Sequence, residues 1–186
     1  MAITVSEIAH FTLEEYHRAI DAGLFCDRRV ELIEGLIVEM PPEGTEHVYF
    51  EENLVDRLKR SLPGRAYIRE SKPITLSNSE PEPDIVVARL PRSQYIEHHP
   101  FPEDISLLIE VSKATRNRDL STKKQLYAAA NIPEYWIVDI KNRKLIVFRS
   151  PESGDYQQSI ALSVSETVSP LAFPDLAIAV SEIFAI

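Results

Sequence analysis

Residues 105–111 read ISLLIEV, an apolar run that carries a single acid, Glu110, near its end. Its length and its aliphatic content predict a buried strand. A charge inside such a strand is costly unless it is paired or bound to a metal ion. A second acid, Asp84, stands near the head of another apolar run, PDIVV at 83–87. Two predicted strands therefore each carry an acid that needs a partner.

The segment after Glu110 predicts the fold class. Asp119 can cap a helix that continues through Asn131, and Pro133 ends it. A nearly continuous apolar run at 135–140 predicts the next strand. Because a strand, a helix and a second strand follow one another here, we expect a parallel crossover and an α/β fold.

The rest of the chain predicts further elements around this crossover. Thr12 to Glu15 has the capping-box pattern of a helix start, and 30–40 predicts a β-hairpin that turns at Glu34-Gly35. The remaining predictions are a helix at 47–62, strands at 66–70, 74–76, 85–88, 145–148 and 156–162, a loop at 91–102, and a short helix or strand in 173–186. No linker is long enough to divide the chain, so we expect residues 1–186 to form one domain.

Composition narrows the function classes. The 186 residues are 44% hydrophobic and 26% charged, which is typical of a soluble globular domain. No apolar run approaches the roughly 18 residues of a membrane span, and the first residues lack a signal-peptide pattern. The lone cysteine, Cys26, is expected to fill the core, and one cysteine suits a reducing cytoplasm.

The charge is unevenly distributed along the chain. The net charge of −9 argues against a general nucleic-acid coat protein. However, residues 57–72 hold 6 bases and 1 acid, and residues 111–149 hold 9 bases and 3 acids. These two blocks could form a local basic surface for a polyanion, or they could be solvated faces without a partner.

Asp84, Glu110 and Lys123 together resemble the components of a metal-dependent phosphodiesterase site. Mg²⁺ prefers oxygen ligands and is usually held by one or two carboxylates together with water and phosphate oxygens. Lys123 lies at the first turn of the predicted crossover helix, which should pack over the strand that carries Glu110. A lysine there could orient the attacking water or stabilise the charge that develops on phosphorus.

These segments, taken in order, resemble the Uma2 family (DUF820). The matching stretches are ELIEG at 31–35, MPP at 40–42 with His47, EPDIVV at 82–87, LIEVS at 108–112, DLSTK at 119–123 with Tyr127, and EYWIVD at 134–139. The family is abundant in cyanobacteria and belongs to the PD-(D/E)XK nuclease superfamily. The resemblance implies a restriction-endonuclease-like mixed central sheet flanked by helices, with an additional N-terminal helix and β-hairpin. It also implies an endonuclease that uses Mg²⁺ or Mn²⁺, cleaves DNA and acts as a homodimer.

The resemblance assigns roles by position. Asp84 matches the first acid and Glu110 the second, and both would bind the metal. The simple motif has lysine two residues after the second acid, where this chain has Ser112, and Lys123 matches the displaced lysine of the Uma2 pattern. Lys113 and Lys124 are weaker substitutes for Lys123. Two further residues could assist the site. One is an acid from the helix at 47–62, either Glu51 or Glu52, and the other is His47.

Each assignment has a structural alternative. Asp84 could cap a turn, Glu110 could pair with a buried arginine, and Lys123 could be a solvated helix residue that pairs with Asp119. His47 could be a surface residue at a helix start. Two other functions are therefore open: a non-catalytic binding or assembly module that keeps the nuclease fold, and hydrolysis of a small phosphoester or nucleotide.

Overall fold

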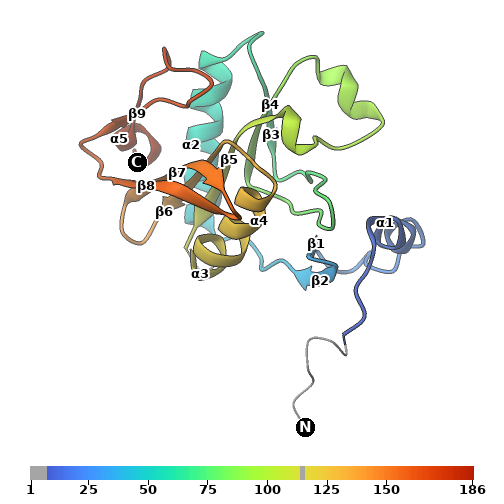
Figure 1. The fold of residues 1–186 in the computed structure, drawn as a ribbon. Coiled ribbons are helices and arrows are strands. Elements are labelled where there is room, and N and C mark those ends of the chain that lie inside the picture. Colours follow the sequence, from blue (N-terminus) through green and yellow to red (C-terminus); the bar gives the residue numbers. More distant parts are fainter. Residues whose placement is uncertain (1–7, 114–115) are drawn as a thin grey trace.

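The computed structural model describes residues 8–113 and 116–186, and a six-stranded mixed sheet forms its centre (Figure 1). The order across the sheet is β3-β4-β5-β6-β7-β8. The strands are β3 (Tyr67–Glu70), β4 (Ile85–Ala88), β5 (Ile105–Ser112), β6 (Glu134–Asp139), β7 (Lys144–Glu152) and β8 (Asp155–Leu162). Only β5 and β6 pair in parallel among these strands, with Glu110 opposite Ile137. The mixed α/β sheet confirms the predicted fold class.

The crossover between β5 and β6 is helical but is not a plain α-helix. It consists of α3 (Arg116–Arg118), a π-helical turn (Asp119–Lys123) and α4 (Lys124–Ala129). The prediction that Asp119 caps this helix is wrong, because helical residues precede it. Asp119 is buried and accepts a hydrogen bond from the hydroxyl of Ser112, at the end of β5, at 2.6 Å. Its side chain therefore binds β5 and does not cap the helix.

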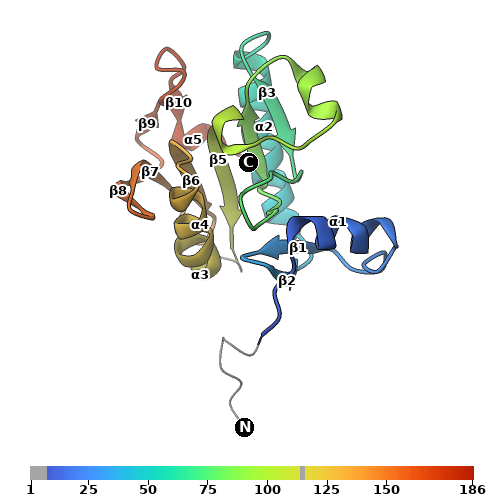
Figure 2. The same ribbon diagram turned by 45° about the vertical axis from the view of Figure 1, so that its right-hand side comes forward.

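Helices cover both faces of the sheet (Figure 2). On one face lie α2 (Thr45–Ser61) and α5 (Val180–Ile183), which share a core cluster with Leu107 and Ile109 of β5. On the other face, α4 packs Leu126 and Tyr127 against Leu108. Because side chains alternate along β5, Glu110 faces the α4 side. The central strands β4, β5 and β6 are thus buried on both faces, as the continuous apolar runs predicted.

The N-terminal helix and hairpin are confirmed. The capping box of Thr12 and Glu15 opens α1 (Leu13–Asp21), and the hairpin consists of β1 (Val30–Ile33) and β2 (Leu36–Glu39). Its turn requires Gly35, which has φ +78 and whose added Cβ would lie 2.7 Å from the Cβ of His10. The hairpin packs against α1, and a β-bridge between Leu32 and Glu80 joins it to the loop between β3 and β4.

Two further local predictions are wrong. Residues 74–76 do not form a strand, because their amides donate to loop carbonyls, such as Ile74 to Pro81 and Leu76 to Ser79. Pro73 precedes this segment and Pro81 accepts from Ile74, and neither proline has an N–H to donate to a ladder. Ile74 and Leu76 are nevertheless buried, as their apolar character indicated. Cys26 is exposed rather than in the core.

The remaining segments agree with the predictions. The loop at 91–102 contains short 3₁₀ turns at Arg92–Ile96 and Pro102–Asp104. The tail forms β10 (Ile178–Ala179), which pairs with β9 (Thr167–Val168), and then α5. Among the helices of residues 8–113 and 116–186, none has the length and hydropathy that crossing a membrane demands.

Candidate active site

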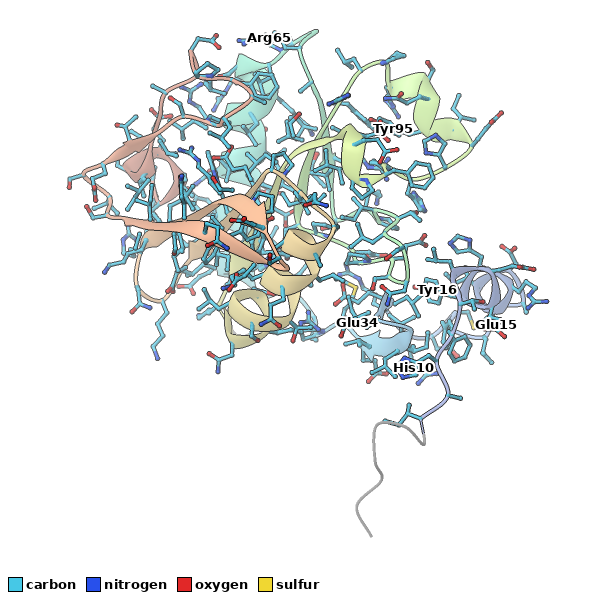
Figure 3. All side chains as sticks on the ribbon, viewed as in Figure 1. His10, Glu15, Tyr16, Glu34, Arg65 and Tyr95 are labelled. Atoms are coloured by element: carbon cyan, nitrogen blue, oxygen red, sulfur yellow. The ribbon has the colours of Figure 1, made fainter. Side chains whose placement is uncertain are left out.

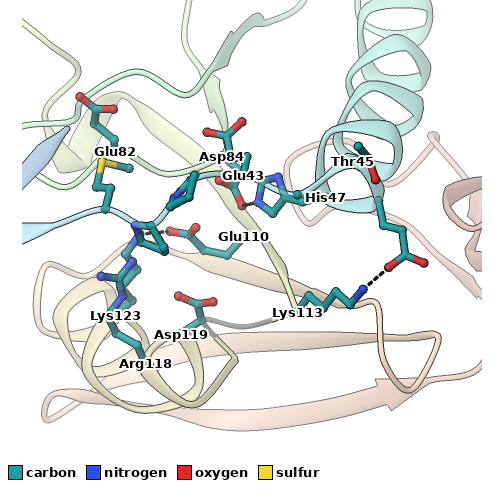
Figure 4. Close-up of a pocket in the computed structure, with 15 residues that line it drawn as sticks. Glu43, Thr45, His47, Glu82, Asp84, Glu110, Lys113, Arg118, Asp119 and Lys123 are labelled. Carbon is teal, nitrogen blue, oxygen red and sulfur yellow. Dashed lines mark hydrogen bonds and ion pairs between the residues drawn. The ribbon is translucent and has the colours of Figure 1, made fainter. Parts of the chain in front are cut away.

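The predicted site residues meet in a pocket of about 460 Å³ between α2, the hairpin and the crossover helix (Figure 4). Asp84, Glu110, Lys123 and His47 all line it. The pocket lies where β4 begins and β5 ends, since these neighbouring strands are antiparallel. The chain therefore brings together acids that are far apart in sequence.

Two donors hold Asp84, which directly precedes β4. Its Oδ2 accepts a hydrogen bond from the backbone N–H of Val111 at 2.6 Å and lies 3.0 Å from Nε2 of His47. Within the described residues, its Oδ1 makes no hydrogen bond. One oxygen thus fixes the carboxylate, and the other is available to a ligand.

Glu110 is paired with a lysine, not with an arginine. Its Oε1 accepts hydrogen bonds from Nζ of Lys123 and from the Tyr127 hydroxyl, both at 2.9 Å. Burial raises the pKa of Glu110, and the positive charge of Lys123 offsets part of that rise. Its Oε2 makes no hydrogen bond in the part of the chain that is described, so Glu110 resembles Asp84 in keeping one oxygen available.

Lys123 is buried, which excludes the solvated alternative. Burial alone would lower its pKa, but the charges of Glu110 and Glu31 outweigh burial and raise it. Lys123 therefore carries its positive charge at neutral pH. Of the two possible substitutes, Lys113 also lines the pocket, but it is exposed and pairs with Glu46. Lys124 does not line the pocket and pairs with Asp155 at 2.7 Å.

Glu31 is a site residue that sequence reasoning missed. It is fully buried in β1, its Oε2 lies 3.5 Å from Nζ of Lys123, and its Oε1 lies 3.4 Å from Arg118. Its Oε2 also accepts a hydrogen bond from the backbone N–H of Glu82. The available signal was an acid in the short apolar strand VELI, the same kind of signal that drew attention to Glu110.

His47 and Glu51 stand beside Asp84 on α2. Nδ1 of His47 is buried without a hydrogen-bond partner and lies 3.7 Å from Oε2 of Glu51. Burial lowers the pKa of His47, but Asp84 outweighs this and raises it. Glu51 is buried and Glu52 is exposed, so only Glu51 faces inward. Together with Glu43, these two residues place one ligand atom each within 4.8 Å of one another.

Glu51 predicts a pH dependence of stability. Burial, and then the charge of Asp84, raise its pKa from 4.5 to about 7. Because the folded pKa lies above the ordinary value, stability from protonated Glu51 is complete below pH 4.5 and is lost as pH rises through about 7. As the pH rises from about 5 to about 8, we expect the stability of Glu51→Gln to increase relative to that of the original protein, because glutamine does not ionise.

Thermal unfolding in EDTA at both pH values would measure this effect. Glu52→Gln is the matched control, because it makes the same substitution at an exposed neighbour and should show no such gain. A Glu51→Gln variant whose stability difference is constant with pH would contradict the assignment.

Comparisons with known proteins agree with this architecture. The chain matches the Uma2 family model, described as "Putative restriction endonuclease", over residues 13–181. It is also similar to the crystal structure of "a putative nuclease belonging to DUF820" from Anabaena variabilis ATCC 29413. That match has a TM-score of 0.78 and 18% identity, and it covers 94% of this chain and 98% of the other, which shows a common fold. No curated protein matches the chain. Since the family model spans most of its length, the chain belongs to the Uma2 family.

Proposed function

We propose that this protein is a divalent-metal-dependent endonuclease that hydrolyses DNA phosphodiester bonds with Asp84, Glu110 and Lys123. The observation that carries the proposal is the convergence of these three side chains in one pocket, with Nζ of Lys123 2.9 Å from Glu110. The description of the family as "Putative restriction endonuclease" supports it.

The donor set fits Mg²⁺ or Mn²⁺. Asp84 and Glu110 offer carboxylate oxygens, the ligand type that both ions prefer. Each acid is positioned through one oxygen and has the other without a hydrogen bond among the described residues. When bound, the ion would stabilise charge on the phosphate and lower the pKa of the attacking water.

Lys123 has the charge and the donors for a role at the phosphate. Its ammonium has three N–H donors. Among the described residues it forms ion pairs with Glu110 and Glu31, so one donor remains for a phosphate oxygen or for the attacking water. Tyr127, one turn after Lys123 on the crossover helix, donates to Glu110, and His47 on α2 holds Asp84. Both acids are therefore positioned before substrate binds.

His47 and Glu51 are accessory residues in this proposal. The Glu43–His47–Glu51 group contains an imidazole nitrogen, which suits Mn²⁺ or another transition ion better than Mg²⁺. A homodimer, a cytoplasmic location and a single domain over residues 1–186 stay predictions.

Plasmid cleavage by the purified protein would test the proposal. We expect nicking of supercoiled DNA with Mg²⁺ or Mn²⁺, none in EDTA, and none by an Asp84→Ala, Glu110→Ala double variant. Equal cleavage by the double variant and the original protein would contradict the proposal. If neither protein cleaves DNA, titration with Mn²⁺ tests the alternative of a non-catalytic module. Stoichiometric Mn²⁺ binding that is lost in Glu110→Ala would count against a non-catalytic module, and absence of such binding would favour it.

A further inference from the structure

A second groove, of about 430 Å³, opens on the edge strand β3. We call it the arginine–tyrosine groove, and its lining residues are Tyr67, Arg69, Arg92, Ser93, Tyr95 and Ile96. Figure 3 labels Tyr95 on the segment between β4 and β5 that forms one wall. This groove shares no lining residue with the candidate active site.

Arg69 is a buried cation in this groove without a compensating anion. It is 8% exposed, and in residues 8–113 and 116–186 it forms no ion pair with a carboxylate. Nη2 donates to the carbonyl of Pro73 at 3.2 Å and lies 3.4 Å from Nδ1 of His99, whereas Nε is buried without a partner. A buried charge in this state is costly, so the groove has the electrostatics of an anion site.

Arg92 adds positive charge inside the groove, and Arg89 lies beside it, since its carbonyl accepts a hydrogen bond from the Tyr95 hydroxyl. Both are exposed, and neither pairs with a carboxylate in the described part of the chain. Two arginines of the basic block at 57–72 differ, since Arg57 and Arg65 form ion pairs with Glu182 and Asp175. The basic block at 57–72 is therefore partly neutralised, and Arg69 is one of the cations that it leaves available.

The two tyrosines provide flat apolar surface beside these cations. Their rings are nearly parallel, with centroids 5.9 Å apart and an interplanar angle of 19°. Arg69 lies 5.7 Å from the Tyr95 ring, and Arg92 lies 5.3 Å from the Tyr67 ring. Ile96, at the rim, is 83% exposed. Aromatic rings next to unpaired arginines are the surface that stacks unpaired bases and binds their phosphates.

The groove faces the same side of the sheet as the candidate active site. Arg69 pairs with Val86, which follows Asp84 by two residues, so the three side chains share one face. Tyr67 and Tyr95 pack against the core cluster that contains Tyr127, and Tyr127 donates to Glu110. A strand bound in the groove would therefore lie on the cleavage side.

We propose that the arginine–tyrosine groove binds single-stranded DNA, an unpaired segment of the substrate beyond the cleaved bond. Arg69 and Arg92 bind its phosphates, and the tyrosine pair stacks a base. The assignment of this DNA as substrate rests on the proposed endonuclease function, but binding at the groove requires neither metal nor cleavage.

Fluorescence anisotropy in EDTA tests this proposal apart from catalysis. The probe is a labelled single strand of about 12 nucleotides, which is within the site size of single-strand binding proteins. We expect Arg92→Glu to raise Kd roughly tenfold and to lower the slope of log Kd against log salt by about 1. Arg60→Glu is the matched control, because it makes the same charge change at an exposed residue of α2, on the other face of the sheet.

Each outcome decides the proposal. Equal weakening by Arg92→Glu and Arg60→Glu would overturn it, as would absence of binding by the original protein. Binding of a nucleoside monophosphate in the groove without binding of the oligonucleotide would also overturn it. A protein that binds the oligonucleotide through Arg92 yet never cleaves DNA would support the groove and count against the endonuclease.

Discussion

Replacing Asp84 with asparagine is expected to abolish metal-dependent DNA cleavage while the protein stays folded. Asparagine keeps the shape and the oxygen that accepts from the backbone of Val111, but it removes the negative charge. A metal ion that stabilises the transition state contributes several kcal/mol, so the loss should be roughly 1,000-fold in rate. Initial rates of plasmid nicking in Mn²⁺, compared at equal protein concentration, would measure it.

The control for this substitution is Asp56→Asn, which removes an acid at an exposed position of α2. Its nicking rate and its thermal midpoint should match those of the original protein. The prediction is wrong if Asp84→Asn cleaves at the original rate, and a collapse of its thermal midpoint would show instead that Asp84 is mainly a structural link between β5 and α2.

The largest expected effect on stability is that of Lys123→Ala. The lysine lies 2.9 Å from Glu110 and 3.5 Å from Glu31, and all three are buried. Its removal leaves two buried carboxylates without their shared cation, which should lower the free energy of unfolding by about 3–5 kcal/mol. Urea unfolding followed by circular dichroism would give this value.

The next residue in the chain supplies the comparison. Lys124 pairs with Asp155, whose side chain is half exposed, so Lys124→Ala should cost less than about 1 kcal/mol. Combining Lys123→Ala with Glu110→Gln should cost less than the sum of the two single changes, because Glu110 then carries no buried charge and Glu31 still lies near Arg118. Equal effects at positions 123 and 124 would contradict the buried network.

Local patterns predicted most of the fold because they reflect burial directly. The run ISLLIEV, the capping box at Thr12 and the turn at Gly35 each appear where the sequence indicated. The strand at 74–76 failed because an apolar, buried segment need not be hydrogen-bonded as a strand, and the prolines around it weighed against a ladder. Periodicity reports which side chains are buried, and it reports hydrogen bonding only indirectly.

The site was partly predictable for the same reason. Asp84, Glu110 and Lys123 were predicted because a charge in an apolar strand needs a partner and because the three residues match the Uma2 motifs in order. All three line one pocket in the structure. Glu31 was missed because its partner comes from the crossover helix, and no local pattern links the two. The π-helical turn that ends at Lys123 begins at Asp119, whose hydrogen bond with Ser112 is likewise a contact between elements.

The contact of Glu31 with Lys123 has a consequence for the order of folding. The hairpin that carries Glu31 is made early in synthesis, and the crossover helix follows much later in the chain. Contacts between such distant segments form late, because closing a long loop costs entropy before the contact repays it. A chain whose hairpin has not docked therefore lacks the second anion that keeps Lys123 charged. The buried network of Glu31, Glu110 and Lys123 is therefore completed only after the crossover helix has been synthesised and the hairpin has docked on it.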